Sequence, residues 1–384
     1  MQITDTVKYV GVDDTKIDLF EGQYRVPNGI SYNSYVIIDE QIAVMDSVDA
    51  RYGKQWLENI ERTLSGREPD YLVIHHMEPD HSASIVDFTE KYPNAKIVSS
   101  AKAFVMMANF FGNDFKDKDK QIVVGEGGKL SLGVHELTFV TAPMVHWPEV
   151  LMSYDSKDKI LFAADGFGKF GIPSADEEWI DEARRYYIGI VGKYGAQVQS
   201  VLKKAAGLDI SIICSLHGPV LTENLGYYIS LYDKWSSYTP ECDGVTVAYA
   251  SIYGNTRRAA ELLAKELSDL GVSVELFDLT VCDKAAAIAS AFKNSKLVLA
   301  SVTYNADVFP AMKEYIHGLV ERGYSRRTVA LIENGSWAPM AAKVMRGMLE
   351  GSKELTVSET AVKISSALND ASRAQIAALA EELA

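Results

Sequence analysis

The chain has 384 residues, which is enough for two domains that each bury a full core. Its composition, with 47% hydrophobic and 23% charged residues, is that of an ordinary globular protein. The net charge of −14 argues against a nucleic acid or an anionic membrane surface as a partner, because surfaces that bind phosphates are usually basic.

The cysteines and the apolar runs of the chain exclude further classes of protein. The three cysteines (Cys214, Cys242 and Cys282) are widely separated and form no C-x-x-C pair, which excludes a rubredoxin-type or other iron–sulfur module within the chain. The N-terminus lacks a secretory signal pattern, and no apolar run approaches the roughly 20 residues that cross a bilayer. We therefore expect a cytoplasmic protein with no membrane partner.

The first half of the chain predicts a β-rich domain with helices between its strands. Short apolar or alternating runs predict strands at residues 24–26, 33–38 and 42–46. Trp56, Ile60 and Leu64 stand at helical spacing and predict a helix over residues 51–63. Further strands are expected at 71–74, 96–98, 121–124, 137–140, 160–163 and 210–214. Helices are expected at 84–92 and 227–235, and a long helical region at 177–202.

The strand at 71–74 runs into the sequence H-H-M-E-P-D-H, which holds four candidate metal ligands. They are His76, Glu78, Asp80 and His81. A lone histidine near a strand is more often a hydrogen-bonded core or surface residue, but four polar ligands within six residues have little structural use. We predict a metal site here, with the ligands in a loop at the strand end.

Three later residues complete a candidate set of seven. They are His146, Asp165 and His217, each at or near the end of a predicted strand. Four histidines and three carboxylates, without a thiolate, favour a non-haem di-iron or di-manganese centre over a structural zinc site.

The pattern resembles the metallo-β-lactamase fold, whose hydrolases carry H-x-H-x-D-H followed by a distant His, Asp and His. Glu78 stands where those hydrolases have their second histidine, and this substitution is the mark of the flavodiiron proteins. The resemblance implies an αββα sandwich. It makes His76, Glu78 and His146 ligands of one iron and Asp80, His81 and His217 ligands of the other, with Asp165 as the bridge.

Residues 236–244 are rich in turn formers and mark the boundary between the first domain and a second one. We predict domains over residues 1–240 and 244–384. Strands and helices alternate regularly through the second, as in a parallel, doubly wound α/β sheet.

A strand at 245–250 leads into a loop and a helix at 257–270, an arrangement that forms an anion site. The loop comprises Ser251, Ile252, Tyr253, Gly254, Asn255 and Thr256. An ordinary capped helix would explain Asn255 and Thr256 but not the whole stretch. We predict that this loop binds a phosphate.

Two more loops follow the predicted strands at 296–301 and 328–332. The first carries Thr303, Tyr304, Asn305, Ala306 and Asp307, and the second carries Asn334, Gly335, Ser336 and Trp337. Loops at the carboxyl ends of parallel strands converge on one crevice, where aromatic rings could stack on a flat ligand. The three loops resemble those of the flavodoxin domain fused in flavodiiron proteins. By that resemblance the ligand is FMN, with residues 251–256 on its phosphate and the other two loops around the isoalloxazine.

The resemblance implies a reductase of O2 to water or of NO to N2O, which passes electrons from FMN to two iron ions. It also implies a head-to-tail homodimer, or a dimer of dimers. No donor domain follows the flavodoxin domain, so we expect an external electron donor, such as rubredoxin or reduced deazaflavin.

A zinc-dependent hydrolase of the metallo-β-lactamase fold is the main alternative. Glu78 and the second domain both disfavour it, since the hydrolase pattern has histidine at that position and hydrolysis has no use for a flavin. An electron carrier whose first domain is only a scaffold would lack ligands, and none is missing. The choice between O2 and NO stays open, and manganese or zinc could occupy the same ligands.

Overall fold

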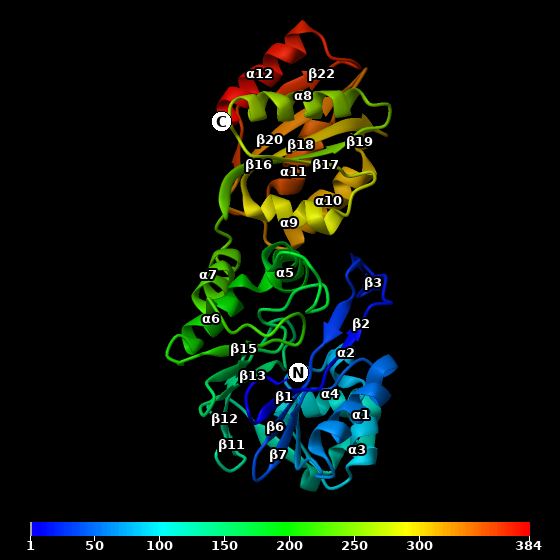
Figure 1. Cartoon of the computed structure of the whole chain (residues 1–384). Coiled ribbons are helices and arrows are strands. Elements are labelled where there is room, and N and C mark those ends of the chain that lie inside the picture. Colours follow the sequence, from blue (N-terminus) through cyan, green and yellow to red (C-terminus); the bar gives the residue numbers. More distant parts are fainter. Residues whose placement is uncertain (1) are drawn as a thin grey trace. The chain divides into compact units, whose positions relative to one another are not determined.

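The computed structural model describes residues 2–384, which separate into two compact units (Figure 1). The first combines the chain up to Tyr187 with Ala196–Asp233, and the second combines Ile188–Gly195 with Lys234–Ala384. Among the described residues, no helix is both long and apolar enough to span a bilayer.

The first unit contains two mixed β-sheets. One has the strand order β1-β6-β7-β8-β9-β10 and the other the order β11-β12-β13-β14-β15. The strands of the first sheet are β1 (Val7–Tyr9), β6 (Tyr35–Ile38), β7 (Ile42–Met45), β8 (Tyr71–Val73), β9 (Lys96–Ser100) and β10 (Gln121–Val124). Those of the second are β11 (Lys129–Ser131), β12 (Glu136–Thr141), β13 (Leu151–Asp155), β14 (Ile160–Phe162) and β15 (Ile212–Cys214). Two short pairs, β2 (Val12–Asp14) with β5 (Ile30–Tyr32) and β3 (Leu19–Phe20) with β4 (Tyr24–Arg25), complete the unit.

Apolar residues from the two sheets share one core. Ile37 and Val73 of the first sheet and Phe139 and Phe162 of the second belong to one buried cluster. Burying one such side chain stabilises a fold by about 1.5–3 kcal/mol, so this shared core holds the sheets face to face. Because the strands that carry candidate ligands come from both sheets, the same packing fixes their ends relative to one another.

Helices cover the outer faces of both sheets (Figure 1). The helices beside the first sheet are α1 (Gly53–Leu64), α3 (Ile85–Lys91) and α4 (Ala101–Phe111), and those beside the second are α6 (Gly195–Ala205) and α7 (Leu225–Ser236). In α1, the predicted face of Trp56, Ile60 and Leu64 is buried. The predicted αββα sandwich is confirmed.

The region 177–202 is helical as predicted, but it is not one continuous α-helix: α5 (Trp179–Tyr186) is followed by a π-helical turn (Tyr187–Val191) and a 3-10 turn (Gly192–Tyr194) before α6 begins. Glycines at 189, 192 and 195 weaken the α-helix there. The ligand run is not wholly a loop either, because Asp80 and His81 lie on the single-turn helix α2 (Pro79–Ser82).

The second unit is a parallel sheet with the strand order β17-β16-β18-β20-β21, and β22 also pairs with β20. Its strands are β16 (Cys242–Ala250), β17 (Val274–Asp278), β18 (Asn294–Tyr304), β20 (Thr328–Asn334), β21 (Thr356–Val357) and β22 (Val362–Ile364), and the short β19 (Asp307–Val308) folds back on β18. Helices α8 (Asn255–Asp269) and α12 (Asp370–Leu383) cover one face, while α9 (Lys284–Lys293), α10 (Pro310–Glu321) and α11 (Ala341–Leu349) cover the other (Figure 1). The predicted doubly wound sheet is confirmed.

Candidate functional site

Hydrogen bonds to neighbouring strands hold the ligand run that follows β8. The backbone N–H of His75 donates to Asp46 Oδ1 at 2.7 Å, and the hydroxyl of Ser47 donates to the carbonyl oxygen of His81 at 2.7 Å. Pro79 occupies the first turn of α2, where its missing N–H costs no hydrogen bond. The four ligand candidates of this run are therefore held close to the end of β8.

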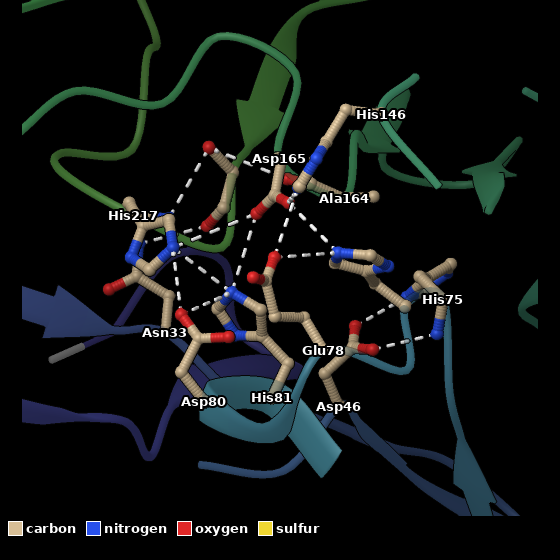
Figure 2. A network of polar contacts seen from close by, with 12 residues as sticks. Asn33, Asp46, His75, Glu78, Asp80, His81, His146, Ala164, Asp165 and His217 are labelled. Atoms are coloured by element: carbon tan, nitrogen blue, oxygen red, sulfur yellow. Dashed lines mark hydrogen bonds and ion pairs between the residues drawn. The ribbon is translucent and has the colours of Figure 1, made fainter. Parts of the chain in front are cut away.

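The other three candidates come from the second sheet and meet this run at the same end of the sandwich. His146 lies between β12 and β13, Asp165 follows β14, and His217 follows β15. Since β14 and β15 are adjacent and parallel, their carboxyl ends place Asp165 and His217 side by side (Figure 2). The structure brings all seven predicted ligands together in two groups.

The first group consists of His76, Glu78, His146 and Asp165. Glu78 Oε2 lies 3.2 Å from Nε2 of His76 and 3.0 Å from Nε2 of His146. Asp165 Oδ2 lies 3.3 Å from each of the same two nitrogens. The four ligand atoms all lie within 4.8 Å of one another, and dashed lines in Figure 2 mark the contacts of His146 with Glu78 and Asp165.

The second group consists of Asp80, His81 and His217. Asp80 Oδ2 lies 3.3 Å from Nε2 of both histidines, and these two nitrogens lie 3.0 Å apart. Asp165 Oδ1 completes the group, at 3.3 Å from His81 and 3.7 Å from His217. The two oxygens of Asp165 therefore face different groups, which is the geometry of a bridging carboxylate.

The spacing and burial of the donor atoms suit metal binding better than hydrogen bonding among the side chains. Atoms bound about 2.0–2.2 Å from one metal lie about 3 to 3.5 Å apart, and every contact named above falls in this range except the 3.7 Å between Asp165 Oδ1 and His217. Both carboxylate oxygens of Asp80 and Oδ1 of Asp165 are buried without a hydrogen bond. A buried carboxylate without such partners is costly unless a cation neutralises it. All seven residues are buried except Glu78, which is half-buried.

Two imidazoles are oriented by hydrogen bonds from their other ring nitrogen. His76 Nδ1 donates to Glu149 Oε1 at 2.8 Å, and His217 Nδ1 donates to the carbonyl oxygen of Ser31 at 2.7 Å. In the neutral rings these bonds leave the Nε2 lone pairs facing the two groups, as a metal ligand requires.

Without a metal, protons take the place of the cations. Burial opposes protonation of His76, but Asp165, Glu149 and Glu78 raise its pKa well above the usual value. Burial likewise lowers the pKa of His146, but hydrogen bonds to Asp165 and Glu78 raise it to about 9. Burial raises the pKa of Asp165, yet the surrounding imidazoles hold it well below its usual range. In the metal-free first group, protonation of His76 and His146 therefore offsets the charge of the neighbouring carboxylates.

Glu149 is a functional residue that the sequence analysis missed. Its Oε1 accepts from both His76 Nδ1 and the backbone N–H of Met77, each at 2.8 Å. It stands only three residues after His146, so an acidic residue beside a predicted ligand was an available signal. Nothing in the sequence, however, indicates that it reaches across to His76.

His75 does not join either group. Its Nδ1 lies 2.5 Å from Asp46 Oδ2 and its Nε2 lies 2.8 Å from the Ser153 hydroxyl. This Asp-His-Ser chain has the connectivity of a hydrolytic triad, but Ser153 is completely buried and cannot meet a substrate. The chain instead ties β7, the ligand run and β13 together.

In the second unit, the three predicted segments lie at the carboxyl ends of β16, β18 and β20, which are neighbours in the sheet. They are not wholly loops, because Thr303 and Tyr304 end β18, Asp307 begins β19 and Asn334 ends β20. The amide of Asn334 lies 3.4 Å from the Thr256 hydroxyl, and the Thr303 hydroxyl accepts from the backbone N–H of Met340 at 3.0 Å. The strand order reverses between β16 and β18, which is where open α/β sheets bind ligands. The structure therefore brings the three loops together at one edge.

The loop predicted to bind a phosphate leads into the N-terminus of α8. Gly254 has a positive φ of 84° and precedes α8, and its N–H donates to the Ser251 hydroxyl at 3.1 Å. The first turn of α8 contains no acidic residue but has Arg257 and Arg258. Tyr253 and Trp337 are 89% and 83% exposed, so their rings are available for stacking.

A fourth loop, which the sequence analysis did not single out, also reaches this edge. Ser366 has a φ of 71°, and its backbone N–H donates to Asn334 Oδ1 at 3.2 Å. Its hydroxyl donates to Ser336 at 2.7 Å. It follows β22, another strand of the same parallel sheet.

Comparisons with known proteins match both units. Residues 30–218 match the ODP family beta lactamase domain, and residues 247–359 match the flavodoxin domain. The anaerobic nitric oxide reductase flavorubredoxin of Aliivibrio fischeri is 31% identical over 335 residues, covering 83% of this chain and 67% of that protein. Its counterpart in Vibrio vulnificus is 28% identical over 350 residues, covering 88% and 70%. The chain thus spans about two thirds of the length of these relatives.

Two solved structures match over the full length. Rubredoxin oxygen:oxidoreductase from Desulfovibrio gigas has a TM-score of 0.91 at 25% identity, covering 100% of this chain and 97% of that one. The flavodiiron protein from Giardia intestinalis has a TM-score of 0.88 at 26% identity, covering 100% and 95%. The chain belongs to the flavodiiron protein family. The flavodoxin domain implies FMN, and the two His and carboxylate groups are consistent with the di-iron centre of flavodiiron proteins.

Removal of the Glu149 carboxylate should weaken metal binding. In Glu149→Gln the amide no longer anchors His76 as a charged acceptor, so we expect metal affinity to fall by about 10- to 100-fold. Metal titration of the apo protein measures this, with the exposed Glu90→Gln as a control. An unchanged affinity in Glu149→Gln would show that His76 needs no support from this residue.

Metal binding should release protons. Because the pKa of His146 is raised to about 9 in the metal-free site, this ring is protonated at neutral pH and must lose its proton before a metal binds. Apparent metal affinity should therefore rise as the pH is raised from neutrality through about that value. Calorimetry in buffers of different ionisation enthalpy counts the released protons, and a count near zero at neutral pH would contradict the charge state described here.

Proposed function

We propose that the protein reduces a neutral diatomic gas, O2 or NO, at a di-iron centre held by His76, Glu78, Asp80, His81, His146, Asp165 and His217. The observation that carries the proposal is the pair of ligand groups joined by Asp165, in a chain that also has a flavodoxin domain. When bound, FMN supplies electrons and two iron ions supply a place where a diatomic can receive them.

The protein's own residues position and shield these cofactors. Glu149 and the Ser31 carbonyl orient two of the imidazoles. Trp147 stands edge-on to His76, with ring centroids 5.2 Å apart, and packs beside the first group. None of the seven ligand candidates is needed as a general base in this proposal.

We assign the FMN phosphate to residues 251–256, and the isoalloxazine to the loops at 303–307 and 334–337. The residues 1–240 and 244–384 are proposed as the metal and flavin domains. The open N-terminus of α8, with Arg257 and Arg258 in its first turn, supports the phosphate assignment. The exposed aromatic rings of Tyr304 and Trp337 support the isoalloxazine assignment.

We further propose that the protein is a homodimer, or a dimer of dimers, and works in the cytoplasm with an external electron donor. Rubredoxin or a reduced deazaflavin is the proposed donor. The relatives named as a rubredoxin oxygen:oxidoreductase and as nitric oxide reductase flavorubredoxins support both the gas substrates and the donor class. A hydrolase is disfavoured because Glu78 belongs to the first ligand group in place of an imidazole.

Gas consumption by the purified protein tests this function. The iron- and FMN-loaded protein is reduced anaerobically and mixed with O2 or NO while electrodes follow each gas. We expect rapid consumption of at least one gas, and the faster reaction identifies the preferred substrate. Consumption of neither gas by fully loaded protein would overturn the proposal.

Replacement of Glu78 by histidine should separate the metal site from the flavin site. Glu78→His removes an anionic donor from the first group, so we expect reduced iron occupancy and loss of gas reduction, with FMN content unchanged. Iron analysis, flavin absorbance and gas electrodes measure the three quantities. Full activity in Glu78→His would refute the assignment of Glu78.

Replacement of Asn255 should do the reverse. Asn255→Ala removes a side chain from the start of α8, so we expect weaker FMN binding with both metals retained. FMN titration of the apo flavodoxin site measures this in the full chain. Ser268→Ala, near the other end of α8, is the matched control; equal flavin affinity in the two variants would count against the phosphate loop.

A further inference from the structure

An apolar pocket of ≈ 290 Å³ lies in the first unit, between helices α6 and α7 and the second sheet. Its outer part is lined by Leu202, Ala205 and Leu225, which are partly exposed on the two helices. Its inner part is lined by Met152 and Ile213, which are buried on β13 and β15. The pocket thus leads from the surface of the helices toward the interior of the unit.

The inner end of the pocket is formed by residues next to two candidate metal ligands. Val145 directly precedes His146, and Gly166 and Phe167 directly follow Asp165; all three line the pocket. Phe167 stacks on Tyr232, with ring centroids 4.2 Å apart, and its backbone N–H donates to the Tyr232 hydroxyl at 2.6 Å. The polar atoms at this end are therefore engaged with each other, and the wall beside the ligands presents mainly carbon.

The chemistry of the pocket selects the molecules that it can hold. Apolar cavities of this kind give water too few hydrogen-bond partners, and they bind small apolar molecules such as xenon. A single water occupies about 30 Å³ of liquid, so ≈ 290 Å³ has ample room for a diatomic gas. Charged or strongly polar molecules would lose their hydration without replacement.

We propose that this pocket binds the neutral diatomic gas and delivers it to the metal site past Val145, Gly166 and Phe167. The inference rests on the proposed reductase function, which requires a neutral, weakly polar gas to reach a buried centre. In this proposal α6 and α7 help to supply the substrate, although neither helix carries a candidate metal ligand.

Xenon tests the pocket independently of activity. Crystals of the metal- and FMN-loaded protein are pressurised with xenon, which should occupy the pocket in the wild-type protein. In Ala205→Trp the indole fills the outer part of the pocket and should displace the xenon. Lys203→Trp places the same ring on the exposed side of α6 and should leave the xenon in place. Leu202→Phe is a smaller filling change that serves if Ala205→Trp does not fold.

Rapid mixing of the reduced protein with limiting O2 or NO gives the kinetic half of the test. We expect the second-order rate constant for the gas to fall several-fold in Ala205→Trp, with the rate at saturating gas and the iron and FMN contents unchanged. Lys203→Trp should match the wild type.

Three results would overturn the inference. They are an absence of xenon from the wild-type pocket, a larger apolar molecule already bound there, and an unchanged rate constant in a variant that excludes xenon. Consumption of neither gas by the wild type is a different failure: it overturns the proposed function, while the xenon result still reports whether the pocket binds apolar gas.

Discussion

The buried carboxylate of Asp165 is the constraint on which the first unit depends. Among the described residues, the groups within ion-pair distance of it are the imidazoles of His76, His81, His146 and His217. These rings come from both sheets, so their separation around Asp165 depends on the shared core. Without metal, the neighbouring carboxylates raise the pKa values of His76, His81 and His146. With metal bound, the same geometry would offer a bridging carboxylate and two sets of terminal ligands.

Both units use the ends of strands in the same way. In the first, β8, β14 and β15 end beside one another, and the chain segments after them bear ligands. In the second, the loops after β16, β18 and β20 meet at the edge where strand order reverses. The hydrophobic cores set the positions of the strand ends, and the loops carry the chemistry. The packing of α6 and α7 on the second sheet also leaves an apolar pocket, which is lined by neighbours in sequence of His146 and Asp165.

The ligand candidates that lie close together in the sequence could be predicted from the sequence alone. His76, Glu78, Asp80 and His81 stand within six residues, and their chemistry is readable without a fold. Asp165 and His217 were placed in two different roles only through the family resemblance, because the spacing between them carries no such information.

What the sequence left out depends on tertiary contacts. Glu149 hydrogen-bonds to the ring of His76, which is 73 residues away in sequence. Ser366 hydrogen-bonds to Asn334 at the edge of the second sheet, and the sequence around Ser366 has no motif that indicates this contact. The helical region predicted over 177–202 is present, but the prediction did not specify the π and 3-10 turns in its middle, where three regularly spaced glycines disfavour a continuous α-helix. The assignment of the individual metal and FMN contacts remains a prediction.

Anomalous diffraction at the iron edge from crystals of the iron-loaded protein tests the central claim most directly. The account predicts two iron peaks, one among His76, Glu78 and His146 and one among Asp80, His81 and His217, with Asp165 bound to both through separate oxygens. A single peak, or peaks that leave Asp165 unbound, would contradict it.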